Sequence, residues 1–130
     1  MIDRHLLPAA KGTYAVLFHL PHPTRQNVGR FGLCDFPEGE YVYIGSAQGP
    51  GGLRARLSRH LTSKVIHPHW HIDAVRACMN LVSFQYLIGA AVECNWVQAL
   101  VSLPGASVPV PGLGASDCRC GCPAHLIRFS

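Results

Sequence analysis

A chain of 130 residues has the length of a single domain, which we place at residues 1–130 with a motif-bearing core at 12–129. Apolar residues make up 48% and charged residues 14%, which excludes an intrinsically disordered chain. The formal net charge is +4 and nearly all of the cations are Arg, whose planar fork binds phosphate, so an anionic partner is favoured.

The first half of the chain is typical of strands separated by turns. Apolar, β-branched and aromatic residues predict three strands, at 13–20, 28–36 and 41–45. Residues 21–26 are expected to form a loop. The turn that begins at Pro37 is expected to join the second and third strands as a hairpin.

From Leu53 the apolar spacing becomes helical, because Leu53, Leu57 and Leu61 recur once per turn and predict a helix at 53–61. The remaining predicted elements are a helix that starts near Pro68, a half-buried strand at 82–88, a helix at 92–103, a loop at 106–115 and an edge strand at 125–129. This order predicts an α+β fold, with a small, mainly antiparallel central sheet flanked by helices.

The chain shows no sign of a membrane or secreted protein. No apolar run approaches the roughly 20 residues of a membrane span, and we expect no membrane partner. The first residues lack the basic and apolar regions of a secretory signal. The six cysteines are therefore expected to be reduced thiols in a cytoplasmic protein.

The first predicted helix begins a basic segment that contains no acidic residue. Arg54, Arg56, Arg59 and Lys64 lie here together with His60. We predict that Arg54, Arg59 and Lys64 bind a nucleic-acid backbone, since clustered cations are typical of such surfaces. The alternative is an ordinary solvated helix face.

Two short tyrosine motifs frame the predicted sheet. Gly12-Thr-Tyr14 begins the first strand and Tyr43-Ile-Gly45 ends the third. They are followed by Arg56 and His60 on one helix and by Glu93 on another. In this order of motifs the sequence resembles the GIY-YIG nuclease superfamily, and more closely the uncharacterised branch that is sometimes fused to endonuclease III-type DNA repair proteins.

The resemblance covers residues 12–129 and implies the GIY-YIG-like fold and a Mg²⁺- or Mn²⁺-dependent DNA endonuclease that acts in DNA repair or processing. It implies Tyr14 as the base, Tyr43 in support, Arg56 on the phosphate and Glu93 on the metal. It also implies DNA as the substrate and an endonuclease III-type repair protein as a partner.

The same residue types suit phosphodiester hydrolysis on chemical grounds. Arg56 can grip a phosphate through two parallel hydrogen bonds, and Glu93 can hold one Mg²⁺ whose other ligands are water and phosphate oxygens. Tyr14 can activate water if its pKa falls from about 10 towards neutrality beside these two charges. Tyr43 and His60 would complete proton transfer or positioning. The structural alternatives are tyrosines packed in the core and a salt bridge between Glu93 and Arg56.

Three features depart from the family pattern. Thr13 replaces the usual Ile, 28 residues separate Tyr14 from Tyr43, and no Asn follows a Pro late in the chain. The extra length predicts that the strand at 28–36 is inserted and that the two tyrosines still meet across the sheet. The missing Asn keeps open a second function, a non-catalytic nucleic-acid-binding or adaptor module that retains the nuclease fold.

Two further clusters contain metal-ligating side chains. His71 and Asp73 lie in the second predicted helix, and Cys118, Cys120, Cys122 and His125 precede the last strand. The first cluster could bind Zn²⁺ or Mn²⁺. The second could bind Zn²⁺, although the cysteine spacing is tighter than the usual two to four intervening residues. The alternatives are a hydrogen-bonded pair of His71 with Asp73, and thiols that pack in the interior.

Overall fold

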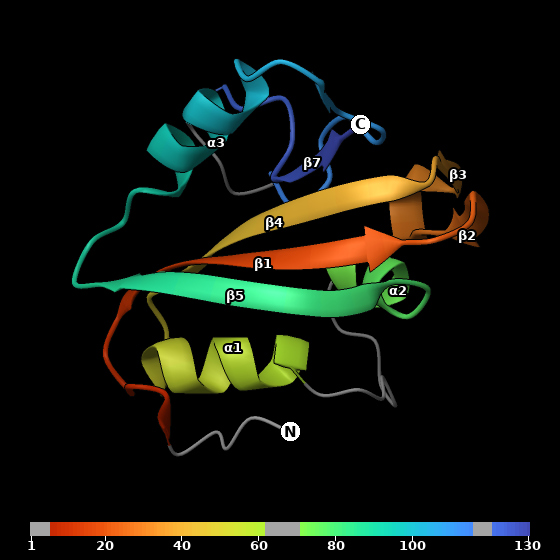
Figure 1. Ribbon diagram of the computed structural model, residues 1–130. Helices are drawn as coiled ribbons and strands as arrows, with labels where there is room; N and C mark the ends of the chain where they lie inside the picture. Colours follow the sequence, from red (N-terminus) through yellow and green to blue (C-terminus); the bar gives the residue numbers. More distant parts are fainter. Residues whose placement is uncertain (1–5, 62–70, 116–120) are drawn as a thin grey trace.

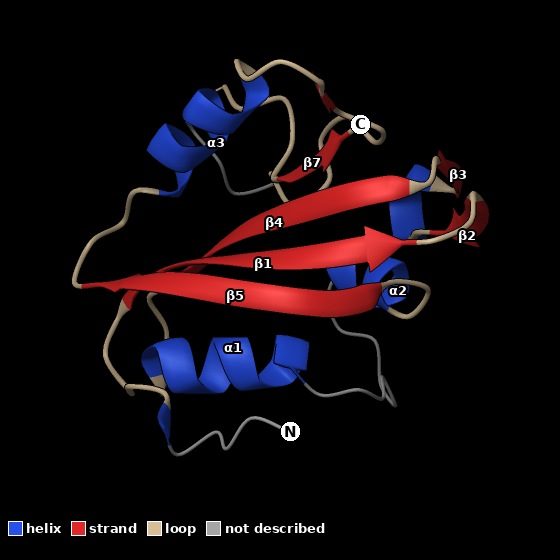
Figure 2. Cartoon of the chain, in the orientation of Figure 1, coloured by secondary structure: helices blue, strands red, loops and turns tan. Residues whose placement is uncertain are grey.

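The computed structural model describes residues 6–61, 71–115 and 121–130, apart from the side chain of residue 71. Its centre is an antiparallel sheet in the order β5-β1-β4-β7-β6 (Figure 1), formed by β1 (Gly12–Leu20), β4 (Gly39–Ala47), β5 (Asn80–Ile88), β6 (Ala106–Ser107) and β7 (Leu126–Phe129). A separate hairpin pairs β2 (Thr24–Asn27) with β3 (Leu33–Phe36). The helices are α1 (Gly52–Leu61), α2 (His71–Arg76) and α3 (Glu93–Val101), which flank the sheet (Figure 2). The predicted α+β class is confirmed.

The strand register gives each face of the central sheet its own side chains. In the β1–β4 pair, Tyr14 lies opposite Gly45 and Val16 lies opposite Tyr43. Because side chains alternate between faces, Tyr14 and Tyr43 share one face, while Ile44 points to the other. The two tyrosines therefore lie diagonally across adjacent strands, as predicted. We call these faces the α1 face and the α3 face, after the helix whose side chains pack on each.

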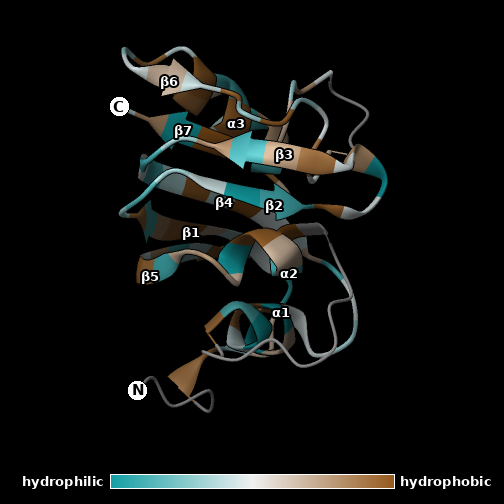
Figure 3. Ribbon diagram, turned by 90° about the vertical axis from the view of Figure 1, so that its right-hand side faces the viewer, coloured by the Kyte–Doolittle hydropathy of each residue, from teal (hydrophilic) through white to brown (hydrophobic). Residues whose placement is uncertain are grey.

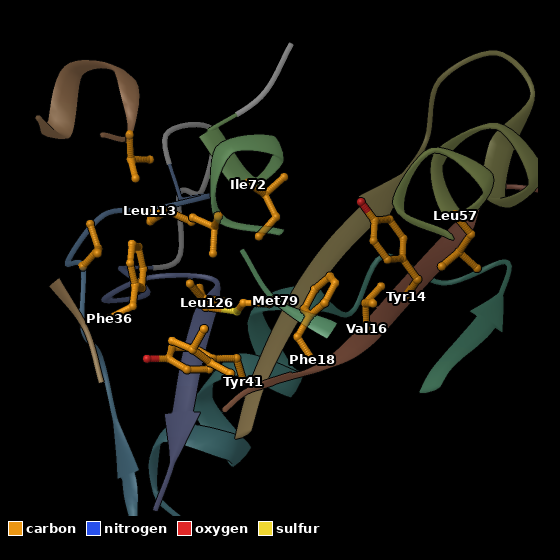
Figure 4. Close-up of a cluster of buried hydrophobic side chains, with 14 of the residues drawn as sticks. Tyr14, Val16, Phe18, Phe36, Tyr41, Leu57, Ile72, Met79, Leu113 and Leu126 are labelled. Carbon is orange, nitrogen blue, oxygen red and sulfur yellow. The ribbon is translucent and has the colours of Figure 1, made fainter. Parts of the chain in front are cut away.

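Most of the apolar core lies on the α1 face. Leu53 and Leu57 are fully buried there, as the helical spacing predicted, and Figure 4 shows Leu57 beside Tyr14. Removing such a leucine side chain from water contributes about 1.5–3 kcal/mol. A smaller cluster on the α3 face joins Val97 of α3 to Ile44 and Ile127. No helix in the described ranges is long and apolar enough to cross a membrane.

The segment between β1 and β4 differs from its prediction. Residues 21–26, expected as a loop, contain the start of β2, whose polar side chains carry no apolar pattern. The strand predicted at 28–36 is reduced to β3, because a 3-10 turn at Gly29–Phe31 and Gly32 with φ of +69° interrupt it. The predicted hairpin is also wrong: β3 pairs with β2, and β4 pairs with β1 and β7 instead. The β1–β4 pairing buries the apolar side chains of both strands.

The predicted positions of strands in the central sheet also differ from the structure. The strand predicted as half-buried is β5, an edge strand with Val82 and Ile88 more than half exposed. Figure 3 shows apolar residues on β5 as well as on the neighbouring β1. The predicted edge strand is β7, which lies between β4 and β6 and buries Leu126 and Ile127. The predicted loop at 106–115 begins with the short strand β6.

Candidate functional site

Tyr14 and His60 form a buried polar pair between β1 and α1. The hydroxyl oxygen of Tyr14 lies 2.9 Å from Nε2 of His60, and each residue is 2% exposed. Tyr43 packs against the same imidazole, with 5.5 Å between the ring centroids. The last turn of α1 thus brings His60 onto the two tyrosines, because Leu53 and Leu57 turn this side of the helix toward the sheet.

Gly45 leaves the space that Tyr14 occupies. A Cβ built on Gly45 would lie 2.3 Å from both Cζ and the hydroxyl oxygen of Tyr14. No real side chain fits at that distance, so the phenol can lie across β4 only where the opposite residue is glycine. The glycine of the second motif therefore has a steric role.

Burial opposes ionisation of all three rings. It raises the pKa of Tyr43 to about 12 and lifts that of Tyr14 well above its ordinary value, while the Arg56 guanidinium acts against this rise in both cases. Arg56 by itself therefore does not outweigh burial at Tyr14, and the predicted fall of its pKa towards neutrality, which also requires a bound metal, stays a prediction. Burial also lowers the pKa of His60 to about 4, so this imidazole is neutral at pH 7. A neutral imidazole has one nitrogen that can accept a proton.

Glu93 is the first residue of α3, and Thr13 holds the segment that leads into it. The Thr13 hydroxyl donates to the carbonyl of Ala90 at 2.7 Å and accepts from the amide of Val92 at 3.0 Å. The Oε2 atom of Glu93 is buried and has no hydrogen-bond partner. A buried carboxylate oxygen without a partner is costly, which favours a cation or a donor at this point.

Arg56 and Glu93 both act electrostatically on the tyrosines. Arg56 lowers and Glu93 raises the pKa of Tyr14 and of Tyr43, so both charges lie within electrostatic range of the phenols. Among the described residues no ion pair joins Glu93 to Arg56, which argues against the salt-bridge alternative. All five residues predicted as catalytic therefore lie in one region of the protein: Tyr14, Tyr43, Arg56, His60 and Glu93.

The basic residues of α1 are partly engaged inside the fold. Arg54 donates from Nε to the carbonyl of Leu7 at 2.9 Å, which ties the N-terminal segment to α1. Arg59 donates from Nη2 to Oδ2 of Asp73 at 2.6 Å. Two of the three residues predicted to bind nucleic acid thus have structural contacts, and the third, Lys64, lies outside the described residues.

Asp73 is fully buried and lies between two arginines. Its Oδ1 accepts from Nε of Arg76 at 3.3 Å, in addition to the bond from Arg59 to Oδ2. Because both carboxylate oxygens face guanidinium groups, a metal ion at Asp73 would meet two positive charges, which disfavours the predicted metal site there. The side chain of His71, and residues Cys118 and Cys120, lie outside the described part of the chain.

Comparison with known proteins assigns a family without an activity. The family described as "Domain of unknown function DUF123" matches residues 13–130, which is nearly the whole chain. The chain belongs to the DUF123 family. No curated protein and no solved structure matches it.

The DUF123 domain also joins residues that the sequence did not connect. Cys122 and His125, both predicted as metal ligands, lie beside Cys94 of α3, with ligand atoms within 4.8 Å of one another. Cys94 was not predicted because it is far from the other two in the chain and lies on a different element. Its position next to Glu93 at the helix start was the one signal that the sequence offered.

Proposed function

We propose that this DUF123 domain is a metal-dependent DNA endonuclease of the GIY-YIG type, which hydrolyses phosphodiester bonds in DNA repair or processing. The observation that carries the proposal is the buried, unpartnered Oε2 of Glu93 within electrostatic range of Tyr14 and its partner His60. With Arg56, the site combines a proton acceptor, a fixed cation and an oxygen ligand. Phosphodiester hydrolysis needs these three kinds of group.

Each side chain has a distinct role in this proposal. Arg56 binds and orients the scissile phosphate through its planar fork. Glu93 fits a Mg²⁺ or Mn²⁺ ion, because its buried oxygen lacks a partner and these ions prefer oxygen ligands. When bound, such an ion would stabilise negative charge on phosphate oxygens. Tyr14 takes the proton of the attacking water as it passes its own hydroxyl proton to Nε2 of the neutral His60.

A nucleic-acid-binding module without turnover is a second function with its own support. Tyr14 is only 2% exposed and burial raises its pKa, which disfavours contact with water and loss of its proton. In this alternative the acid-free helix α1, with Arg56, still attracts the phosphate backbone. Binding would then weaken as salt concentration rises.

The proposal also includes an endonuclease III-type repair protein as a partner and the cytoplasm as the compartment. Cys34 and Cys78 are free thiols, which suits a reducing compartment. Sedimentation of the purified chain with a purified endonuclease III-type protein tests the partner, since a complex would sediment faster than either component.

A cleavage assay tests the endonuclease. It uses labelled duplex, nicked, branched and single-stranded DNA, with RNA alongside, in Mg²⁺, in Mn²⁺ and in EDTA. We expect cutting of DNA that requires metal and falls by about 100-fold or more in Glu93→Gln and in Tyr14→Phe. Glu38→Gln is the matched control, because Glu38 is an exposed carboxylate outside the site, and it should retain full cutting.

The outcomes separate the two functions. Salt-sensitive binding of DNA without cutting on any substrate would favour the binding module. Equal cutting by wild type, Glu93→Gln and Tyr14→Phe would trace the activity to a contaminating nuclease or remove both residues from the mechanism. A folded chain that neither cuts nor binds would reject both functions.

A further inference from the structure

We propose that Cys94, Cys122 and His125 bind a Zn²⁺ ion that ties the start of α3 to the C-terminal segment. The two sulfurs and a ring nitrogen of His125 lie within 4.8 Å of one another. Cys94 is in the first turn of α3, Cys122 is in the loop before β7, and His125 directly precedes β7. The site uses none of the proposed catalytic residues and does not depend on the endonuclease proposal.

The state of His125 is an independent observation that points to a ligand. The residue is 5% exposed, and its Nε2 is buried without a hydrogen-bond partner. Its backbone is held firmly, since the amide donates to the carbonyl of Leu113 at 2.8 Å and the carbonyl accepts from the amide of Ile44 at 2.9 Å. A buried imidazole nitrogen on a fixed backbone is unfavourable unless something binds it.

The donor set selects zinc over the ions proposed for Glu93. Two thiolates and one imidazole suit Zn²⁺, whereas Mg²⁺ prefers oxygen ligands. A tetrahedral ion with Zn–S bonds of about 2.3 Å holds its ligand atoms about 3.8 Å apart, so a spacing within 4.8 Å closes with small side-chain rotations. Nε2 of Gln98 donates to Sγ of Cys122 at 3.8 Å, a contact of the kind that orients metal ligands.

Gly114 links Tyr43 to this cluster, and Glu93 precedes Cys94 in the chain. A Cβ built on Gly114 would lie 2.9 Å from Cε1 of Tyr43 and 3.1 Å from Cβ of His125, so Gly114 is in contact with both side chains. Cys94 directly follows Glu93 in α3. An ion bound here would hold the Tyr43 ring and the Glu93 helix start in a fixed relation, which is the role of a structural zinc.

Metal analysis of the purified full-length chain tests the site. The protein is purified under reducing conditions and passed through a desalting column, which removes unbound zinc. The zinc that remains is then measured by mass spectrometry. We expect about one zinc per chain. Replacement by Co²⁺ should give the sulfur-to-cobalt charge-transfer absorption of a thiolate site, and Co²⁺ affinity should fall by about 100-fold or more in Cys94→Ser, Cys122→Ser and His125→Gln.

Cys78→Ser is the matched control, because Cys78 is a half-buried free thiol after α2 whose bond to the Val75 carbonyl serine can also make. It should keep the zinc content of the wild type. Circular dichroism of each variant separates loss of a ligand from loss of the fold. The site would be rejected by a reduced wild-type chain without zinc, by a disulfide between Cys94 and Cys122 in its place, or by folded ligand variants that keep their zinc. None of these measurements involves DNA cleavage.

Discussion

The hydroxyl oxygen of Tyr14 and Nε2 of His60 lie 2.9 Å apart, although 46 positions separate the two residues in the chain. Their bond joins the first strand of the sheet to the last turn of α1 inside the core. It satisfies two polar groups that burial would otherwise leave without partners. Because burial excludes solvent from both rings, it also holds the phenol protonated and the imidazole neutral.

The lowered pKa of His60 predicts a loss of stability in acid. The pKa is about 4 in the folded chain and 6.5 as the ordinary value, so below pH 6.5 the unfolded chain takes up the proton first. The contribution of this neutral imidazole to the free energy of unfolding is complete above pH 6.5. It is lost as the pH falls through 4, and the total loss is about 3 kcal/mol. Urea unfolding at pH 7 and at pH 4.5 measures the loss.

His60→Gln should flatten this pH dependence, because the variant has no group that titrates between these limits at position 60. The pKa of His60 can also be followed directly by NMR titration of the imidazole. A measured pKa near 6.5 would contradict the prediction.

Gly45→Ala should displace Tyr14. The new methyl would lie 2.3 Å from Cζ and the hydroxyl oxygen of Tyr14, so the phenol must rotate and its bond to His60 must break. We expect a loss of about 2–3 kcal/mol in the free energy of unfolding. Gly49→Ala is the control, since its methyl would make only an ordinary contact, 3.7 Å from Nη2 of Arg56. Equal thermal midpoints for the two variants would overturn this steric account.

Asp73→Asn should destabilise the fold much more than loss of a surface pair. It leaves Arg59 and the nearly buried Arg76 without their common carboxylate, which we expect to cost about 3 kcal/mol in urea unfolding. Asp35→Asn breaks the exposed pair with Arg25 and should leave the urea midpoint unchanged. If Asp73 were instead a zinc ligand, Asp73→Asn would lower the zinc content, and we expect no such change.

Thr13→Val should weaken the attachment of α3. Valine keeps the shape of the fully buried threonine but cannot bond to Ala90 and Val92, and we expect a loss of about 1–3 kcal/mol. Thr24→Val removes a single exposed bond to a neighbouring carbonyl and should cost less than about 0.5 kcal/mol. Hydrogen exchange at the start of α3 provides a local readout. Unchanged protection there in Thr13→Val would show that other contacts hold the helix.

The sequence by itself determined the elements whose residues carry their own pattern. Leu53 and Leu57 are spaced for a helix and are buried as that spacing requires. The run of apolar, β-branched and aromatic residues at 13–20 likewise predicted a strand, and β1 spans Gly12–Leu20. Such patterns are local, so they can be detected without knowing what packs against them.

Strand partners and edges were decided only by the tertiary structure. The hairpin predicted for 28–36 and 41–45 failed because the partner of β4 is β1, a strand that precedes it with β2 and β3 between. The apolar side chains of β5 indicated burial, yet within the described part of the chain no strand pairs with its outer edge. Pairing depends on which distant segments compete for the same backbone groups and apolar surface, and a local pattern contains no information on that competition.

The chemistry of the site divides in the same way. The family resemblance, carried by the order of the motifs, implied that the predicted catalytic residues belong together: Tyr14, Tyr43, Arg56, His60 and Glu93. The sequence could not predict that burial would raise the pKa of Tyr14, or that Cys94 would meet Cys122 and His125. Ionisation and ligand geometry depend on solvent exclusion and on distances between side chains, and both arise only when α1, α3 and β7 pack on the sheet.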